Sequence, residues 1–282
     1  MPGTLFVVAT PIGNLEDVTL RALRILREVS LIAAEDTRRT SRLLQHYSIS
    51  TPTTSLHEHN ERRRTPELIE RLQGGASIAL VSDAGTPIVS DPGSFLVSAA
   101  HAAGIRVEPI PGPSAVTAAL SASGLAEREF LFVGFPPPRD GARRAWLERL
   151  TNEPRAVVCY EAPHRIRATL TAMLEVFGDR IIALGRELTK THEELVVRPI
   201  SHLLDGKVLE ERGEFTLVIS GFRPNTEALP KPSPEDVAAI FGDLTNNMSL
   251  SRREALREIA SKFQISTREV FALLEEVKYS PE

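Results

Sequence analysis

The first third of the chain alternates short apolar runs with stretches in which apolar residues recur at helical spacing. The apolar runs predict strands at residues 5–8, 30–34, 77–81 and 105–110. The segments between them predict helices: one capped by Asp17 with Leu20, Leu23 and Leu26 on its apolar face, one over 61–73, and one that begins at Pro92 and ends at Gly104. Strands that alternate with helices are typical of an α/β domain with a mainly parallel sheet.

The segment PIPGPSAVTAALSASG at 109–124 predicts a stiff turn that leads into a closely packed helix, and so a hinge between two domains. Beyond it, apolar runs predict strands at 130–135, 155–160, 180–185 and 214–220. A helix between them carries Ile166, Leu170, Met173 and Phe177 at helical spacing and ends before Gly178. Because these strands follow one another more closely, we expect mixed or antiparallel pairing.

The last part of the chain is proline-rich and polar at 223–234, as linkers are, and then turns helical. Ser251 with Glu254, and Ser266 with Glu269, fit the capping box of a helix start. The two helices, joined by QIS at 264–266, resemble a helix-turn-helix, and a hairpin used only for packing is an equal alternative. Their apolar faces carry Leu256, Ile259, Ala260 and Phe263, then Val270, Leu273, Leu274 and Val277.

These patterns together predict an α/β protein with two domains and a helical tail. The expected parts are an N-terminal parallel α/β domain (1–112), a second α/β domain with a mixed sheet (113–223), a linker (224–234) and a C-terminal helical segment (235–282).

Composition agrees with a globular protein outside the membrane. Of the 282 residues 42% are hydrophobic and 25% charged, and the apolar runs are far shorter than the roughly 20 residues that span a bilayer. The first apolar run has no basic segment before it and predicts a strand instead of a signal peptide. The single cysteine, Cys159, excludes an internal disulfide, so we expect a cytoplasmic protein with Cys159 in its core.

Charge adds one feature, a clustering of arginines. The net charge of −4 counts mildly against a nucleic-acid partner. The arginines nevertheless gather in four groups, and a guanidinium group matches phosphate oxygens well. A polyanionic partner is therefore plausible beside the simpler reading of solvated helix faces. The groups are Arg38, Arg39 and Arg42; Arg62, Arg63 and Arg64; Arg139, Arg143 and Arg144; and Arg252, Arg253 and Arg257.

Several familiar ligand motifs are absent, including the phosphate-binding loop of nucleotide hydrolases, the glycine fingerprint of dinucleotide-binding proteins and the nucleophile elbow of hydrolases. Instead, glycine- and proline-rich loops follow the predicted strands at 9–14, 82–87 and 109–114. Ligands of open α/β sheets bind at the carboxyl ends of the strands, so these loops are expected to share one cleft. Because Asp83 lies there without cationic side chains, the cleft suits a neutral or locally cationic ligand. His57 and His59 predict a polar loop and no metal site.

Seven segments then occur in a familiar order: ATPIGNLEDVTLRAL, AEDTRRT, VSDAGTPIVSDPG, IPGPSAVTAALSASGL, FVGFPP, YEAPHR and GRELTKTHEE. Together they resemble the tetrapyrrole-methylase superfamily of S-adenosylmethionine-dependent enzymes, and most closely its bacterial branch that methylates small-subunit ribosomal RNA. The resemblance covers about residues 1–222. It implies a two-domain α/β fold that holds the cofactor between its domains, usually as a homodimer. It also implies 2′-O-methylation of a cytidine in the decoding region of 16S ribosomal RNA.

Carried over motif by motif, the resemblance implies a cofactor pocket drawn from both domains. Its expected members are Pro11, Ile12, Asp83, Ala84, Gly85, Thr86, Pro87, Pro111, Gly112, Pro113, Ser114, Ala115, Phe135, Tyr160, Glu161 and Leu188.

The methyl acceptor, a ribose hydroxyl, has to lose its proton, and a carboxylate or a neutral lysine can serve as the base. Asp36 is a candidate for base or ribose positioning, although it equally fits the cap of a helix over 37–45. Glu187 and Lys190 are further catalytic candidates, or else a surface ion pair. The expected RNA contacts are Arg38, Arg39, Arg42, Arg62, Arg63 and Arg64. Two alternatives stay open: a methyltransferase of a corrin or other tetrapyrrole precursor, and a non-catalytic RNA-binding protein.

Overall fold

The computed structural model describes residues 2–125, 128–205, 209–223, 232–246, 250–263 and 267–279. The chain forms two compact units, Met1–Phe222 and Arg223–Glu282. Within the described residues, no helix is both long enough and apolar enough to span a membrane.

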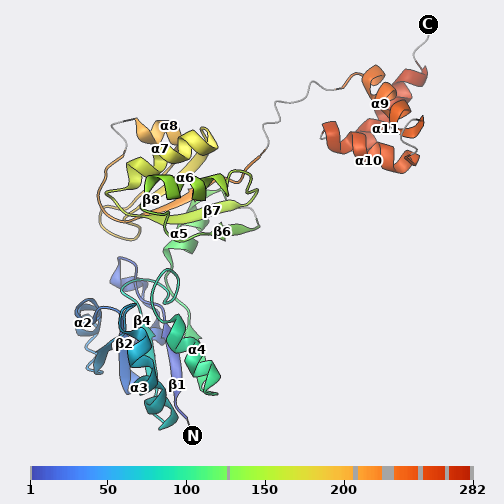
Figure 1. Cartoon of the computed structure of the whole chain (residues 1–282). Helices are drawn as coiled ribbons and strands as arrows, with labels where there is room; N and C mark the ends of the chain where they lie inside the picture. The colour runs from blue at the N-terminus through green and yellow to red at the C-terminus, as the bar shows by residue number, and fades with distance from the viewer. Residues whose placement is uncertain are drawn as a thin grey trace. The chain divides into compact units, whose positions relative to one another are not determined.

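A five-stranded parallel sheet organises the first part of the first unit, in the order β3-β2-β4-β1-β5 (Figure 1). Its strands are β1 (Thr4–Val8), β2 (Leu31–Ala34), β3 (Thr53–Ser55), β4 (Ile78–Val81) and β5 (Arg106–Ile110). Its helices are η1 (Leu15–Asp17), α1 (Leu20–Glu28), α2 (Thr37–His46), α3 (Glu61–Gln73) and α4 (Ser94–Ala102). The prediction of a parallel α/β arrangement is confirmed.

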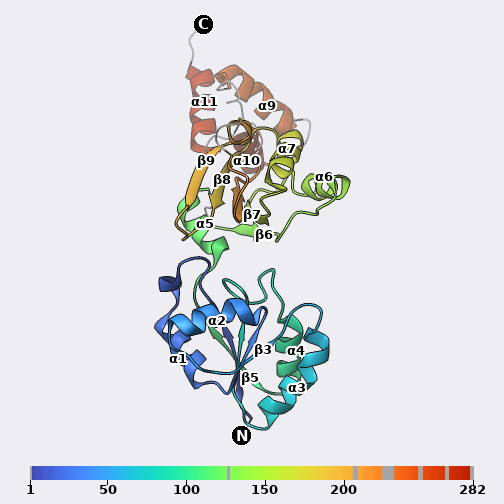
Figure 2. The same cartoon turned by 90° about the vertical axis from the view of Figure 1, so that its left-hand side faces the viewer.

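Side chains alternate between the two faces of the sheet, so each buried strand contributes residues to two separate hydrophobic cores. Ile32 and Ala34 of β2 pack with α1 and α2, whereas Leu31 and Ala33 of the same strand pack with α3 and α4. Figure 2 shows these helix pairs on opposite faces of the sheet. Because both faces are covered, β2 and β4 are buried along their whole length.

Two predicted helix starts are wrong in detail. Thr19, not Asp17, caps α1, because its side-chain oxygen accepts a hydrogen bond from the Ala22 N–H at 3.1 Å. Asp17 instead ends the short 3-10 helix η1. Helix α4 begins at Ser94 and not at Pro92, because Gly93 adopts φ 122° and separates the proline from the first turn.

The second sheet is mixed, as expected, with the order β6-β7-β10-β8-β9. β6 and β7 pair in parallel, and the other neighbours are antiparallel. The strands are β6 (Phe130–Phe132), β7 (Ala156–Glu161), β8 (Ile181–Arg186), β9 (Glu194–Pro199) and β10 (Phe215–Ile219). The helices are α5 (Ala115–Ser123), α6 (Asp140–Glu148), α7 (Ile166–Phe177) and α8 (Ile200–Leu204).

The hydrophobic core on one face of the second sheet contains Cys159, the single cysteine of the chain. Cys159 is fully buried in β7, among apolar residues that also come from α6, α7 and α8. Burial raises the pKa of the Cys159 thiol, so the group stays protonated and behaves as a small apolar side chain. Helix α5 packs on the opposite face through Val116 and Ala119.

The second unit contains α9 (Pro234–Asn246), α10 (Arg252–Phe263) and α11 (Thr267–Tyr279). Their shared core includes Val237, Ile259, Val270 and Leu274. The Ser251–Glu254 capping box is confirmed, since the Ser251 N–H donates to the Glu254 carboxylate at 2.9 Å and the Glu254 N–H donates back at 3.4 Å. Most of the expected linker, the QIS turn and Ser266 lie outside the described residues.

Candidate active site

A cavity of about 350 Å³ lies in the first unit, where loops that follow strands of both sheets meet. This volume lies within the roughly 300–1,000 Å³ of small-molecule sites. It is lined by Ile12, Ala84, Gly85, Thr86, Val89, Ser90, Asp91, Ser114, Ala115, Phe135, Tyr160, Glu161, Ala162, Pro163, Leu188, Lys190, Glu214, Phe215 and Thr216.

Backbone hydrogen bonds tie the first wall of the cavity together. Thr10 and Gly85 exchange N–H···O=C bonds of 2.8 and 3.0 Å, which join the loop after β1 to the loop after β4. The Thr86 hydroxyl donates to the Pro113 carbonyl at 3.2 Å and adds the loop before α5. Gly85 adopts φ 77°, which is strained for a side chain, and a Cβ there would lie 3.3 Å from Ile12.

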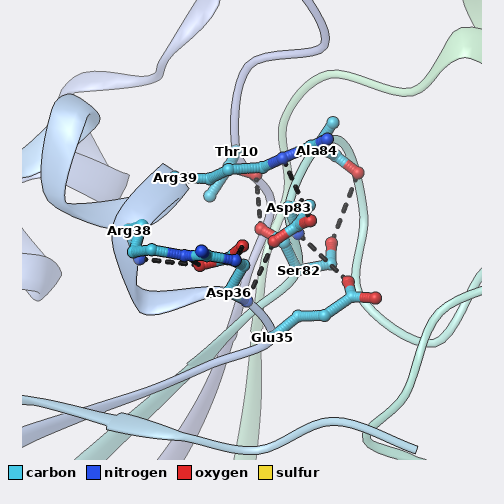
Figure 3. A network of polar contacts seen from close by, with 8 residues as sticks. All are labelled: Thr10, Glu35, Asp36, Arg38, Arg39, Ser82, Asp83 and Ala84. Atoms are coloured by element: carbon cyan, nitrogen blue, oxygen red, sulfur yellow. Dashed lines mark hydrogen bonds and ion pairs between the residues drawn. The ribbon is translucent and has the colours of Figure 1, made fainter.

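A polar network stands behind this wall (Figure 3). The Asp83 carboxylate accepts a hydrogen bond from the Asp36 N–H at 2.9 Å and forms an ion pair with Arg39 at 3.5 Å. The Asp83 N–H donates to Glu35 at 3.3 Å. Asp83 therefore fixes the loop after β4 to the start of α2. Because Ala84 to Thr86 of this loop line the cavity, that part of the wall is held in place as well.

Asp36 caps α2 by accepting a 2.8 Å hydrogen bond from the Arg38 N–H, and it also forms an ion pair with the Arg38 side chain at 2.8 Å. These Arg38 contacts lower the pKa of Asp36 to about 2. The carboxylate is therefore a weak proton acceptor, and Asp36 is not among the residues that line the cavity. The geometry agrees with the alternative role as helix cap.

The loop from Ile88 to Asp91 is held in a rare backbone conformation. Ile88 and Ser90 have φ values of 77° and 68°, which are unusual for residues other than glycine and most of all for a β-branched one. Such conformations persist where the surrounding structure imposes them, and they concentrate at functional sites. Here the conformation places Ser90 and Asp91 in the cavity wall.

Asp91 has an unusual electrostatic environment. Burial, and next the nearby charge of Glu35, raise its pKa to about 6, although a hydrogen bond with Ser82 opposes the shift. Tyr160 lies in the same wall, and burial together with the charge of Asp91 raises the Tyr160 pKa to about 12. At neutral pH the cavity thus presents an Asp91 carboxylate that is ready to accept a proton, beside a protonated phenol.

The second sheet supplies an apolar wall. The Phe135 and Tyr160 rings lie 5.4 Å apart, and the exposed Phe135 closes one side of the cavity. Glu161 is buried, but its carboxylate is fully engaged by Arg165 at 2.6 Å, Thr169 at 2.5 Å and the Ala162 N–H at 2.7 Å. Glu161 therefore shapes the wall and holds the start of α7.

Glu187 and Lys190 form an ion pair of 2.7 Å, and Lys190 also contacts Glu214 at 3.0 Å. Burial lowers the pKa of Lys190, but the two carboxylates outweigh it and leave the pKa raised. Lys190 therefore enters the cavity wall as a cation and not as a base. Glu187 and Thr189 have positive φ, so this loop is also held in a rare conformation.

The residues expected from the sequence divide into two groups. The structure brings eleven into the cavity wall: Ile12, Ala84, Gly85, Thr86, Ser114, Ala115, Phe135, Tyr160, Glu161, Leu188 and Lys190. The others are outside the wall: Pro11, Asp83, Pro87, Pro111, Gly112 and Pro113 lie in the same loops, and Asp36 and Glu187 contact residues beside it.

Eight residues of the cavity wall were not predicted from the sequence: Val89, Ser90, Asp91, Ala162, Pro163, Glu214, Phe215 and Thr216. Five of them could have been predicted, because they belong to the segments VSDAGTPIVSDPG and YEAPHR that carry the family resemblance. The last three gave no signal beyond a strand, since only the pairing of β10 between β7 and β8 carries them to the cavity.

The arginines expected to bind RNA differ in their surroundings. Arg38 pairs with Asp36 and Arg39 with Asp83, while Arg42 is exposed on α2. On α3, Arg62 lies over Phe95, Arg63 is exposed, and Arg64 contacts Glu67 and Thr54. The RNA-binding role of these six arginines stays a prediction.

The charged side chains of the cavity wall indicate which kind of ligand the cavity can bind. Among the described residues of its wall, Lys190 is the one cation, while Asp91, Glu161 and Glu214 carry carboxylates. This balance disfavours a polyphosphate and suits a ligand with an apolar part and a positive centre. The described residues also contain no group of three histidine, cysteine, aspartate or glutamate side chains that could hold a metal.

Comparisons with known proteins agree with this geometry. The family model of tetrapyrrole (corrin/porphyrin) methylases matches residues 4–204. Ribosomal RNA small subunit methyltransferase I of Pseudomonas aeruginosa is 52% identical over 225 residues, 78% of this chain and 80% of that protein. The protein of the same name from Synechocystis sp. is 45% identical over 276 residues, 96% of this chain and 97% of that protein.

A solved structure shares the fold at lower identity. It is the uroporphyrin-III C-methyltransferase of Thermus thermophilus complexed with S-adenyl homocysteine, which is 19% identical with a TM-score of 0.56. The match covers 77% of this chain and 97% of that one.

Proposed function

The chain belongs to the tetrapyrrole methylase family, and from that premise we propose that it transfers a methyl group from S-adenosylmethionine to small-subunit ribosomal RNA. The match to the Synechocystis relative, which is named for ribosomal RNA methylation, extends over 96% of this chain. The observation that carries the proposal is the cavity, because its walls draw on six of the seven segments that define the resemblance.

The finer parts of the proposal concern the acceptor and the assembly. The acceptor is the ribose 2′-hydroxyl of a cytidine in the decoding region of 16S ribosomal RNA. The protein works in the cytoplasm, where ribosomal subunits are made, and as a homodimer. The relatives' names support the ribosomal part of this proposal and leave the nucleotide, the dimer and the location as predictions.

The cavity fits the cofactor on three grounds: its volume, its apolar wall and its excess of carboxylates. The backbone of Ala84 to Thr86 and of Ser114 and Ala115 would hold the polar parts, and Phe135, Tyr160 and Leu188 would pack against the apolar parts. S-adenosylmethionine supplies, when bound, an electrophilic methyl group on a sulfonium centre. Arg165 offsets the charge of Glu161, and Lys190 that of Glu214, so the carboxylate of the wall that most favours a positive charge in the cavity is Asp91.

We assign the proton of the acceptor hydroxyl to Asp91. Asp91 lines the cavity, and burial raises its pKa to about 6, closer to neutral pH than the pKa of an ordinary aspartate. The cationic Lys190, fixed between Glu187 and Glu214, would orient the acceptor by donating hydrogen bonds. The role of Asp36 as base or ribose-positioning residue stays a prediction.

A transfer assay tests the proposed function directly. The chain is incubated with S-adenosylmethionine carrying a labelled methyl group, together with either 30S subunits or a corrin precursor. We expect label in the 16S ribosomal RNA of the subunits and none in the corrin. Label in the corrin alone would favour the tetrapyrrole alternative, and cofactor binding without transfer to either would favour a non-catalytic RNA-binding protein.

A further inference from the structure

Phe95 is a large aromatic side chain that remains 41% exposed on the first turn of α4. Its ring is not isolated, because the Arg62 guanidinium of α3 lies 5.5 Å from the ring centroid. An exposed ring with a guanidinium over it is the combination that stacks unpaired nucleic-acid bases, through π-faces and cation–π attraction.

The topology places this pair at the same edge as the cavity. Helices α2, α3 and α4 each follow a parallel strand, so their first turns lie at the carboxyl ends of the strands, where ligands bind. Phe95 follows Asp91 of the cavity wall by four residues. Phe95 is therefore close along the chain to the part of the cavity wall that contains Asp91.

The backbone under Phe95 is firmly held. Glu61 is buried at the start of α3, and its carboxylate accepts hydrogen bonds from the Phe95 N–H at 2.8 Å and the Leu96 N–H at 3.2 Å. This contact caps α4 and ties α3 to α4, so the backbone segments that carry Arg62 and Phe95 are held together. A rigid aromatic binds a base with a smaller loss of conformational freedom than a mobile one.

The surrounding charge suits a polyanion. Arg62 and Arg63 are exposed, and Arg64 is shared with Glu67 and Thr54. Glu61, which precedes Arg62 on α3, is buried and accepts hydrogen bonds from backbone N–H groups of α4. The arginines can thus neutralise phosphates beside a stacked base.

We propose that Phe95 and Arg62 form a stacking subsite for an unpaired RNA base close to the nucleotide that is methylated. This subsite rests on the proposed function, since it presumes an RNA acceptor. It binds the base by its π-face and so without strong sequence preference, while Arg62 and Arg63 contact the flanking phosphates.

The test compares Phe95→Leu, Phe95→Trp and Arg62→Gln with the wild-type full chain. Methyl transfer to 30S subunits gives kcat and KM, a filter assay gives 30S affinity at several salt concentrations, and calorimetry gives S-adenosylmethionine affinity. Phe130→Leu is the matched control, because Phe130 is equally exposed, at 44%, on the edge strand β6.

We expect Phe95→Leu to raise the KM for 30S subunits about tenfold, with kcat and cofactor affinity within twofold of wild type. Phe95→Trp keeps the wild-type KM because it keeps the ring. Arg62→Gln weakens 30S binding and reduces its salt dependence, whereas Phe95→Leu leaves the salt dependence unchanged. Phe130→Leu matches wild type throughout.

The outcomes separate the subsite from the proposed function. Wild-type transfer with an unaltered KM in Phe95→Leu overturns the subsite alone. Binding of 30S subunits without transfer, but weakened in Phe95→Leu, overturns the proposed function and supports the subsite. A wild-type chain that neither methylates nor binds 30S subunits overturns both.

Discussion

At the scale of single residues, Asp91 is the proposed proton acceptor of the transfer reaction. Its carboxylate lies in the cavity wall, next to a backbone that is held in a rare conformation at Ile88 and Ser90. Burial and the charge of Glu35 raise its pKa to about 6. Both features cost stability, and both make sense if the protein needs a proton acceptor there.

We predict that Asp91→Asn lowers kcat for transfer to 30S subunits about 100-fold, the smaller end of what a general base contributes. The wild-type kcat should rise with pH up to about 6 and then level off, because Asp91 ionises in that range. The variant should lose this rise. Steady-state kinetics from pH 5 to 8 measure both effects, and calorimetry should give an unchanged cofactor affinity.

The control is Asp140→Asn, an exposed carboxylate on α6, which should leave the profile intact. Stability gives an independent check. The folded pKa is raised above the ordinary value of 3.8, so ionisation of Asp91 removes stability as pH rises from about 4 to about 6. Asp91→Asn should therefore be at least as stable as wild type above pH 6. A wild-type kcat in a well-folded variant would remove Asp91 from the mechanism.

At the scale of elements, the hydrophobic pattern of the sequence predicted the strands that contain a short apolar run. Apolar runs located β2 and β4 because these strands are buried along their whole length. They also located β1, with Leu5 and Val8 buried, and β5, with Ile110 buried. The pattern missed β3, which has only three residues and two threonines, and β9, whose half-buried residues gain their place by pairing with β8. Pairing of this kind is a long-range property that no local window contains.

The same division applies to the site. The glycine- and proline-rich loops gave the Gly85 and Ser114 parts of the wall, since turn chemistry is local. The resemblance, and not any pattern, added Phe135, Tyr160 and Leu188. Neither gave Asp91 its role, because that depends on burial and on Glu35, which is distant in sequence.

The contact between α3 and α4 yields a prediction about stability. Glu61→Ala removes a buried carboxylate that accepts two backbone N–H groups of α4, so it should lower the free energy of unfolding by about 2 kcal/mol. Urea denaturation measures the change, and hydrogen exchange should quicken at Phe95 and Leu96. Glu70→Ala, exposed on the same helix, is the control and should change little. Equal effects of both variants would contradict the capping role.

At the scale of the whole molecule, the chain is two units with separate cores. The second unit rests on a small cluster in which Val237, Ile259 and Val270 are fully buried. A unit of this size buries little apolar surface, so its stability is expected to be marginal. Cofactor binding, in contrast, is assigned entirely to the first unit.

We therefore predict that Ile259→Ala destabilises the second unit by about 2–5 kcal/mol and leaves the first unit folded. Hydrogen exchange followed by mass spectrometry should show faster exchange in α9, α10 and α11 only. Calorimetry should show an unchanged affinity for S-adenosylmethionine. The exposed Glu258→Ala is the control, and a loss of cofactor affinity in Ile259→Ala would show that the units depend on one another.

Methyl transfer to small-subunit ribosomal RNA is measured by mapping ribose methylation in 16S ribosomal RNA with mass spectrometry. The RNA is taken from cells that lack this protein and from the same cells supplied with the wild-type chain or with Asp91→Asn. We expect one 2′-O-methylated cytidine of the decoding region to disappear without the protein, to return with the wild-type chain and to be strongly reduced with the variant. An unchanged methylation map in cells without the protein would contradict this expectation.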